Sequence, residues 1–172
     1  MRRGWCLLIL IAGAGGAQEE RPPRALTHDE VAREMVAAHN GLRRRVGVPP
    51  LVWSDRLGLV AQKWADSLMT RGRFEHTPNS ALGENLFELQ GTGRGVAASP
   101  AQVVADWASE ARDYDYAANS CRDVCGHYTQ LVWRETKSLG CAVARGGGGA
   151  GWREVWVCEY DPPGNWQGRR PW

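Results

Sequence analysis

The most informative segment of this chain is Gly126-His127-Tyr128-Thr129-Gln130-Leu131-Val132-Trp133. It places a histidine beside a glycine, and polar side chains among aromatic and aliphatic ones. Three other short segments also combine polar side chains with glycine or aromatic residues. They are His39-Asn40-Gly41-Leu42-Arg43, Gly83-Glu84-Asn85-Leu86 and Cys158-Glu159-Tyr160-Asp161-Pro162-Pro163-Gly164-Asn165-Trp166.

The N-terminal residues differ in character from the rest of the chain. Arg2 and Arg3 precede an apolar run over residues 5–12 and small residues over 13–17, an order typical of a secretory signal peptide. The apolar run is well short of the ~20 residues that a membrane-spanning helix needs. We therefore expect cleavage near Ala17, no transmembrane anchor, and a secreted protein, extracellular or, in a bacterial host, periplasmic.

The composition favours one compact domain, because 43% of the 172 residues are hydrophobic and 23% are charged. Without residues 1–17 the chain has 19 basic and 19 acidic side chains, a balance that argues against a nucleic-acid partner. Arg43, Arg44 and Arg45 form a short basic cluster, which we interpret as a solvated helix face without a function. We expect a monomer.

Four cysteines remain after cleavage: Cys121, Cys125, Cys141 and Cys158. An even number in an exported chain favours disulfides, and their spacing fits a four-thiolate zinc site less well. Four cysteines allow three pairings. If strands over 139–145 and 152–160 pair about the centre of the glycine-rich loop between them, Cys141 lies opposite Cys158. Cys121 then pairs with Cys125.

Three helices are predicted from their caps. A capping box of Thr27 and Glu30 begins the first, which stops at Gly47; Ser54 begins the second, which ends near Gly72; Ser99 and Gln102 begin the third, which runs through Trp107. Residues 18–26 form an extended lead-in. We expect the glycine-containing stretch between the second and third helices to be rich in loops.

The four segments quoted first resemble the four signature motifs of the CAP superfamily, the cysteine-rich secretory, antigen 5 and pathogenesis-related 1 proteins. They follow the family's order at similar spacing, from about residue 31 to the end. The resemblance implies an α+β fold, a three-layer α-β-α sandwich, with the CAP domain over residues 27–172. It is nearest to the plant pathogenesis-related 1 type, on Asp113-Tyr114-Asp115-Tyr116 and the ending Gly164 to Trp172.

The chain departs from the family pattern in two respects. Glu159 stands where the family usually has asparagine, histidine, arginine, glutamine or serine, so contacts made by that side chain differ here. One cysteine shortly before His76 and another a few residues after Cys141 are absent, and in the family these two pair with each other. Their joint absence leaves two bridges, in agreement with the pairing inferred from the hairpin.

The resemblance implies a cleft lined by His76, Glu84, Glu110 and His127. Two imidazoles and two carboxylates could bind Zn²⁺ or another divalent cation, or act as general acids and bases. The alternative is structural: Glu84 and His127 could tie loops together, and His76 could be an exposed turn residue. We interpret His39 and Asn40 as helix residues that fasten neighbouring loops, and His28 as exposed.

The resemblance supports several functions. The sequence has no Gly-x-Ser-x-Gly nucleophile motif. A cysteine nucleophile is not expected either, because all four mature cysteines are assigned to disulfides. We expect a non-enzymatic binding or defence-type protein that accepts a sterol or fatty acid near the cleft. One alternative is a metal-dependent hydrolase, a protease or esterase, in which Glu84 or Glu110 activates water. Another is a precursor that releases a signalling peptide spanning Pro162 to Trp172.

Overall fold

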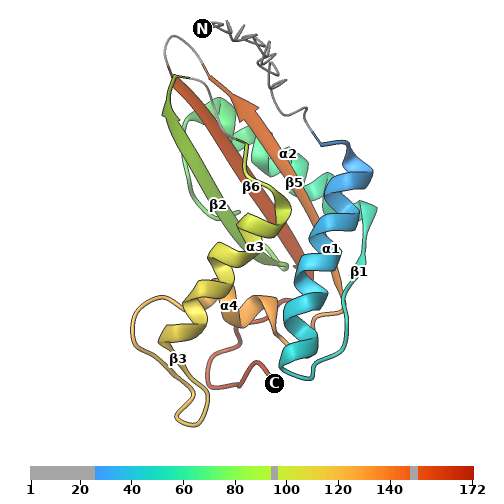
Figure 1. The fold of residues 1–172 in the computed structure, drawn as a ribbon, viewed down its shortest axis with the longest axis vertical. Helices are drawn as coiled ribbons and strands as arrows, with labels where there is room; N and C mark the ends of the chain where they lie inside the picture. The colour runs from blue at the N-terminus through green and yellow to red at the C-terminus, as the bar shows by residue number, and fades with distance from the viewer. Residues whose placement is uncertain (1–25, 94–96, 148–150) are drawn as a thin grey trace, which may run out of the picture.

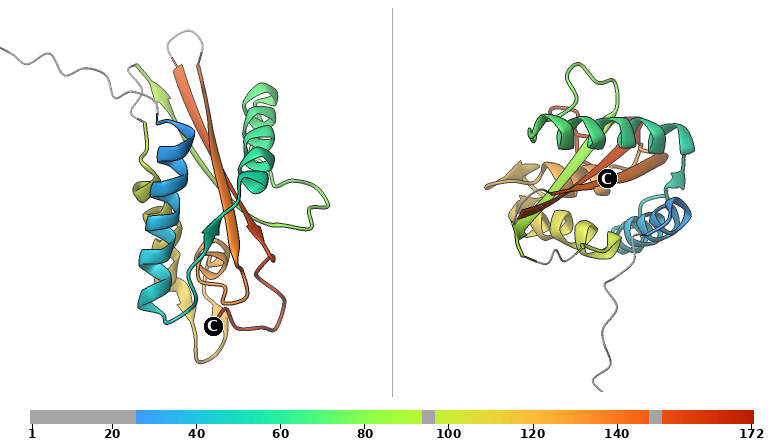
Figure 2. Two further views of the ribbon diagram at one scale, coloured as in Figure 1. Left: turned by 90° about the vertical axis from the view of Figure 1, so that its right-hand side faces the viewer. Right: turned by 90° about the horizontal axis from the view of Figure 1, so that it is seen from above.

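A four-stranded sheet lies between two layers of helices in the computed structural model of the chain (Figure 1). The structure describes residues 26–93, 97–147 and 151–172, so the expected signal peptide over 1–17 lies outside the described residues. In the view from above in Figure 2, α2 covers one face of the sheet, and α1 and α3 cover the other. This is the α-β-α sandwich that the motifs predicted.

The three long helices begin at the predicted caps. Thr27 caps α1 (His28–Arg45), and its side chain and that of Glu30 form the expected reciprocal bonds. Ser54 caps α2 (Asp55–Arg71), which ends at Gly72 in the left-handed region, φ 62°. Ser99 caps α3 (Pro100–Ser109). None of the helices in the described ranges is both long and apolar enough to cross a membrane.

The sheet has the strand order β1-β5-β6-β2, in which only β1 and β5 are parallel. Its members are β1 (Val52–Trp53), β2 (Gly83–Thr92), β5 (Ser138–Gly146) and β6 (Gly151–Asp161). The predicted terminal hairpin is β5 and β6.

The expectation that the stretch between α2 and α3 is rich in loops is wrong for β2. This strand pairs antiparallel with β6 along its whole length, from Gly83 opposite Tyr160 to Thr92 opposite Gly151. Glycines at 83 and 91 weaken the local preference for a strand, but pairing with a distant segment overrides it.

Two apolar clusters fill the space on either side of the sheet. Trp107 of α3 and Trp156 of β6 are buried on the face of α1 and α3, whereas Ala61, Ala65 and Leu68 of α2 pack against the other face. The first turn of α2 lies so close to β5 that a Cβ atom added at Gly140 would come within 2.1 Å of the Gly58 nitrogen.

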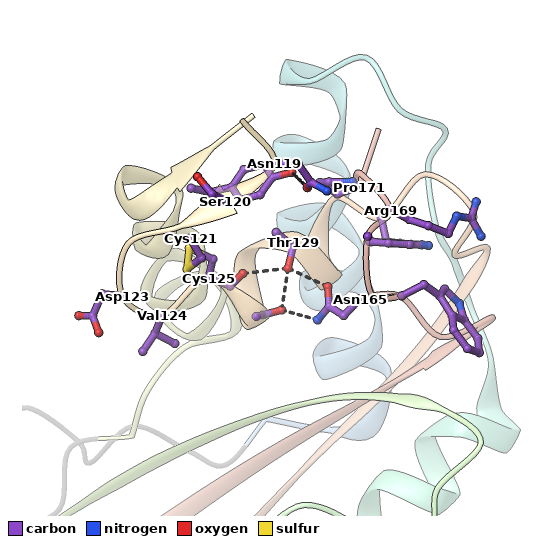
Figure 3. A pocket seen from close by; sticks show the side chains of 15 residues that line it. Asn119, Ser120, Cys121, Asp123, Val124, Cys125, Thr129, Asn165, Arg169 and Pro171 are labelled. Carbon is purple, nitrogen blue, oxygen red and sulfur yellow. Dashed lines mark hydrogen bonds between the residues drawn. A yellow bond between two sulfur atoms is a disulfide. The ribbon is translucent and has the colours of Figure 1, made fainter. Parts of the chain in front are cut away.

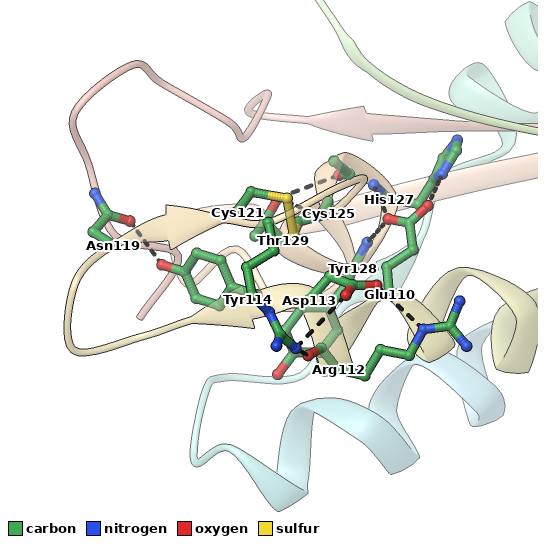
Figure 4. Close-up of a disulfide and its surroundings, with 12 residues drawn as sticks. Glu110, Arg112, Asp113, Tyr114, Asn119, Cys121, Cys125, His127, Tyr128 and Thr129 are labelled. Carbon is green, nitrogen blue, oxygen red and sulfur yellow. Dashed lines mark hydrogen bonds and ion pairs between the residues drawn. A yellow bond between two sulfur atoms is a disulfide. The ribbon is translucent and has the colours of Figure 1, made fainter.

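Both predicted disulfides are confirmed. Cys141 and Cys158 are directly opposite each other on β5 and β6, with Cα atoms 4.1 Å apart. Cys121 and Cys125 form the second bond, with Cα atoms 6.0 Å apart. This second bond joins the small hairpin of β3 (Tyr114–Asp115) and β4 (Ser120–Cys121) to the start of α4 (Gly126–Leu131) (Figure 4).

The interpretation of Arg43 as a solvated residue is wrong. Arg43 is fully buried, and its guanidinium donates hydrogen bonds to four backbone carbonyls, those of Pro49, Leu131, Trp133 and Thr136. These bonds join α1 to the segment after α4. Arg44 and Arg45 are exposed, as expected.

Asn40 fastens the neighbouring loop at Leu51, as the sequence suggested, whereas His39 contacts its own helix and Tyr160 of β6 instead of a loop. The Asn40 amide accepts from the Leu51 nitrogen at 2.7 Å and donates to the Leu51 oxygen at 2.9 Å. His39 is buried, with Nδ1 2.7 Å from the Met35 carbonyl and Nε2 2.9 Å from the Tyr160 hydroxyl. Burial lowers the pKa of His39 to about 4, so this imidazole stays neutral.

Candidate functional site

Glu110 holds His127 through two hydrogen bonds and Tyr128 through a third. The carboxylate of Glu110, at the end of α3, lies 2.6 Å from Nδ1 of His127 and accepts from the backbone nitrogens of His127 and Tyr128 at 2.9 and 3.1 Å (Figure 4). It thereby caps the first turn of α4, where backbone N–H groups have no partner within the helix. The ring of His127 also stacks on Trp107, with centroids 6.1 Å apart.

Glu84 holds His76 in a similar way. Its carboxylate, at the start of β2, lies 2.6 Å from Nδ1 of His76 and accepts from the Thr77 nitrogen at 3.0 Å and the Thr77 hydroxyl at 2.7 Å. The hydrogen bond to Glu84 raises the pKa of His76. Burial alone would raise the pKa of Glu84, but the hydrogen bonds from His76 and Thr77 outweigh it and lower that pKa.

The two pairs lie near the outer edge of β2, the strand that ends the sheet. Asn85 donates to the carbonyl of His127 at 3.2 Å, and the Trp107 indole donates to the carbonyl of Leu86 at 3.0 Å. Side chains alternate along a strand, so Glu84 points to the face opposite Asn85. The two pairs therefore flank the edge of β2, His127–Glu110 from the α3 side and His76–Glu84 from the α2 side, and a cation bound by both histidines would have to lie across that edge.

The four residues are thus arranged as two imidazole–carboxylate pairs. Within the described ranges, no three or more His, Cys, Asp or Glu side chains are grouped so that they could hold a metal ion. The four-residue metal site stays a prediction. The donor chemistry fits a cation bound by the histidines: when Nδ1 donates its proton to a carboxylate, Nε2 is left with the lone pair that a metal ligand needs. The glutamates then orient the rings.

Glu159, the departure from the family pattern, lies directly across the strand pair from Glu84. Its side chain is fully buried, and neither carboxyl oxygen accepts a hydrogen bond from any donor among the described residues. Burial raises the pKa of Glu159 to about 8, and the charge of Glu84 and a hydrogen bond between the protonated Glu159 and Glu84 add to this rise.

A pocket of about 490 Å³ adjoins α4 on the side of the C-terminal segment (Figure 3). Its floor includes Thr129, whose hydroxyl donates to Asn165 at 2.7 Å, and its wall includes the Cys121–Cys125 disulfide. Val124 and Trp166 line it and are 53% and 54% exposed. Apolar and polar side chains both line the pocket, a combination that ligand sites commonly show.

The fold and the contacts among the motif residues agree with a comparison of the sequence with protein families. The model of the CAP family, described as the cysteine-rich secretory protein family, matches residues 36–160. The chain belongs to this family.

Within this family, the chain is similar to plant pathogenesis-related 1 proteins. The chain is 37% identical over 165 residues to pathogenesis-related protein 1 of Arabidopsis thaliana, covering 96% of this chain and 94% of the relative. It is 44% identical over 138 residues to the basic form of pathogenesis-related protein 1 of Nicotiana tabacum, covering 77% and 71%. These relatives support a defence-type protein.

Solved structures show the same fold. NaASP2, crystallised with Zn²⁺, superposes with a TM-score of 0.68 at 24% identity, covering 88% of this chain and 90% of NaASP2. The venom allergen-like protein 4 of Schistosoma mansoni gives 0.64 at 24% identity, covering 86% and 95%.

The sequence singled out all four members of the pairs but missed the residues that support them. Thr77, which bonds Glu84 twice, follows His76 directly in a polar turn, and that adjacency was the available signal. From the sequence, Trp107 is placed only within the third helix. No local pattern indicates that its indole would bond the edge of β2 and its ring support His127.

Proposed function

We propose that this chain is an extracellular, non-enzymatic binding protein in which His76 and His127 bind a divalent cation and the pocket beside α4 takes a small apolar ligand such as a sterol or fatty acid. The observation that carries the proposal is the pair of 2.6 Å contacts between a histidine Nδ1 and a partly buried carboxylate. Such contacts fix both rings in one tautomer, as is typical of metal-ligating histidines.

The cation would be Zn²⁺ or another divalent ion that accepts imidazole nitrogen. Zinc in particular takes histidine nitrogen and carboxylate oxygen ligands. The crystal structure of NaASP2 with Zn²⁺ gives this proposal a precedent within the fold. Zinc would supply positive charge in the cleft, while Glu84 and Glu110 hold the rings and balance part of that charge.

The apolar ligand would occupy the pocket of about 490 Å³, a volume within the usual range of ligand sites, roughly 300–1,000 Å³. Val124 and Trp166 would contact the apolar body of the ligand. Asn165 and Thr129, at the base, would meet its polar end.

Thermal unfolding in the presence of Zn²⁺ tests the metal proposal. We expect zinc to raise the Tm of the wild-type protein, because a ligand that binds only the folded state stabilises it. His76→Gln and His127→Gln should each abolish most of that rise. His28→Gln is the matched control, since His28 is an exposed histidine outside the cleft, and it should respond as the wild type does.

Binding of a radiolabelled sterol and a radiolabelled fatty acid tests the ligand proposal. Val124→Asp should weaken binding by about tenfold, because a charge at the rim opposes an apolar ligand. Leu59→Asp places the same charge on another exposed aliphatic residue, on α2, and should leave binding unchanged. Absence of both zinc stabilisation and lipid binding in the wild-type protein would reject the proposal.

A metal-dependent hydrolase would give a different result in the same protein. An imidazole held by a carboxylate is also a competent general base, which is the observation that favours this second function. Zinc-loaded protein would then turn over peptide or ester substrates, and both a chelator and Glu84→Ala would abolish the turnover. We expect no turnover.

A further inference from the structure

A second pocket lies between the turn after α4 and the C-terminal segment. It has a volume of about 210 Å³ and is lined by Trp133, Arg134, Glu135 and residues 169–172. The Arg134 nitrogen donates to the Pro171 carbonyl at 2.6 Å, so the two segments are joined by their backbones. The pocket contains neither member of either imidazole–carboxylate pair.

The charges in this pocket do not balance. Arg134, Arg169 and Arg170 bring three guanidinium groups, and Glu135 is the one carboxylate side chain that lines the pocket. Glu135 forms an ion pair with Arg169. Among the described side chains, the guanidinium groups of Arg134 and Arg170 form no ion pair with a carboxylate.

The remaining arginines differ in what they contact. Arg170 donates to the carbonyls of Tyr116 and Ala117 at 3.1 and 2.8 Å, bonds that use its donors without neutralising its charge. The exposed Arg134 side chain forms no hydrogen bond or ion pair with any residue in the described ranges. All five of its N–H donors are therefore available to a ligand.

Aromatic rings hold two of the guanidinium groups in place. Arg169 lies over Trp133 with 6.0 Å between the guanidinium carbon and the ring centroid, and Arg170 lies over Tyr116 at 5.7 Å. Trp133 is 2% exposed and so gives the pocket a fixed wall. Guanidinium groups placed in advance lose less freedom when they bind a ligand.

We propose that this pocket binds a tetrahedral oxyanion, the phosphate or sulfate group of a small ester, through Arg134 and Arg170 with Arg169 at its edge. The planar donor fork of arginine matches the oxygens of such groups and bonds them in pairs. Two unbalanced positive charges fit a doubly charged phosphate ester better than a singly charged ion. This pocket contains no member of the proposed cation site, and it shares Trp133, Arg169 and Pro171 with the pocket proposed for the apolar ligand, whereas Arg134 and Arg170 line it alone.

Calorimetric titration of the metal-free protein with inorganic phosphate, at constant ionic strength set by NaCl, tests the proposal. We expect saturable binding to one site, and at least a tenfold loss of affinity in Arg134→Gln because the free guanidinium is the main anchor. Arg33→Gln is the matched control: Arg33 is also exposed and lies on the first half of α1. It should bind as the wild type does.

Methyl phosphate and methyl sulfate separate the two sources of the oxyanion. At pH 7.5 methyl phosphate carries close to two charges and should bind more tightly than methyl sulfate, which carries one. The reverse order would overturn the assignment to a phosphate ester. No saturable binding of any probe, or an equal loss in Arg134→Gln and Arg33→Gln, would overturn the site itself, whatever zinc or lipid binding shows.

Discussion

Glu159 is a buried acid whose environment opposes its charge. It is fully enclosed, lies across the strand pair from the charged Glu84, and accepts no hydrogen bond from any donor in the described part of the chain. Its pKa is about 8 in the folded protein, against ~4.3 for a glutamate in an unfolded chain. The folded state thus keeps a proton that the unfolded state releases. The contribution of Glu159 to stability therefore falls as the pH rises from about 4 to about 8 and levels off above that.

Replacing this acid by an amide removes the free-energy cost of ionising a buried carboxyl group. We expect Glu159→Gln to gain stability relative to the wild type as the pH rises from 5 to 8, reaching roughly 1–3 kcal/mol at pH 8. A pKa shift of one unit corresponds to about 1.4 kcal/mol, so the expected gain is smaller than the whole shift would give. The reason is that the oxygen of the buried amide also lacks a hydrogen-bond donor. Urea unfolding across this pH range measures the gain.

Glu154 supplies the matched control, because it is equally buried but fully bonded. Its carboxylate accepts from the Ala98 nitrogen, the Trp156 indole and Arg145. Glu154→Gln should therefore destabilise the protein at every pH between 5 and 8. A loss of similar size in Glu159→Gln would contradict the interpretation of Glu159.

The hydroxyl of Tyr160 donates to the buried, neutral ring of His39. Tyr160→Phe leaves Nε2 of His39 without a donor in the core, and we expect a loss of about 1–3 kcal/mol in urea unfolding. Tyr114→Phe is the comparison, because its hydroxyl bonds Asn119 at a partly buried position where water can replace it. An effect at Tyr160 no larger than at Tyr114 would argue against this bond.

At the scale of elements, the contact between α2 and the sheet depends on Gly140. A Cβ atom there would lie 2.1 Å from the Gly58 nitrogen and 2.5 Å from the Leu57 carbonyl carbon, backbone atoms that cannot move without displacing the helix. We expect Gly140→Ala to cost about 1–3 kcal/mol or more, because the added atom overpacks the contact between α2 and β5. The free energy of unfolding measures it.

Gly41 is the control for that substitution, because it lies within α1 and the nearest atom to an added Cβ is 4.0 Å away. Gly41→Ala should stabilise the protein by about 0.5–1 kcal/mol, since alanine restricts the unfolded chain and favours the helix. If Gly140→Ala were equally harmless, the helix would have room to move on the sheet.

Elements with local signals could be predicted, and those that depend on distant partners could not. Ser54, Thr27 and Ser99 mark the helix starts by side-chain bonds within three residues, so they are visible in the sequence. The edge strand β2 becomes a strand through its pairing with β6, more than 50 residues away.

The same distinction applies to the site. The motif resemblance supplied all four members of the imidazole–carboxylate pairs, but not which glutamate holds which histidine in space. The burial of Arg43 was also invisible, because three of its four carbonyl partners lie 88 to 93 residues further along the chain. Such contacts follow from tertiary packing alone.

At the scale of the whole molecule, the C-terminal segment closes the lower end of the fold over the small hairpin (Figure 1). The ring of Trp172 stacks on Tyr116 at 4.7 Å and meets Tyr114 and Tyr128 at 6.1 and 6.0 Å. These contacts fix the C-terminal segment, which forms one wall of both the 490 Å³ and the 210 Å³ pocket, since residues 169 and 171 line both.

Loss of the Trp172 ring should release this segment without unfolding the domain. We expect Trp172→Ala to be cut by trypsin after Arg169 several times faster than the wild type, because a protease needs a locally unfolded chain. The bond after Arg170 precedes Pro171 and resists trypsin. Trp166→Ala, at a tryptophan that is 54% exposed, should leave the rate unchanged. Equal cleavage of both variants, followed by mass spectrometry, would mean that the stacking on Tyr116 does not hold the segment.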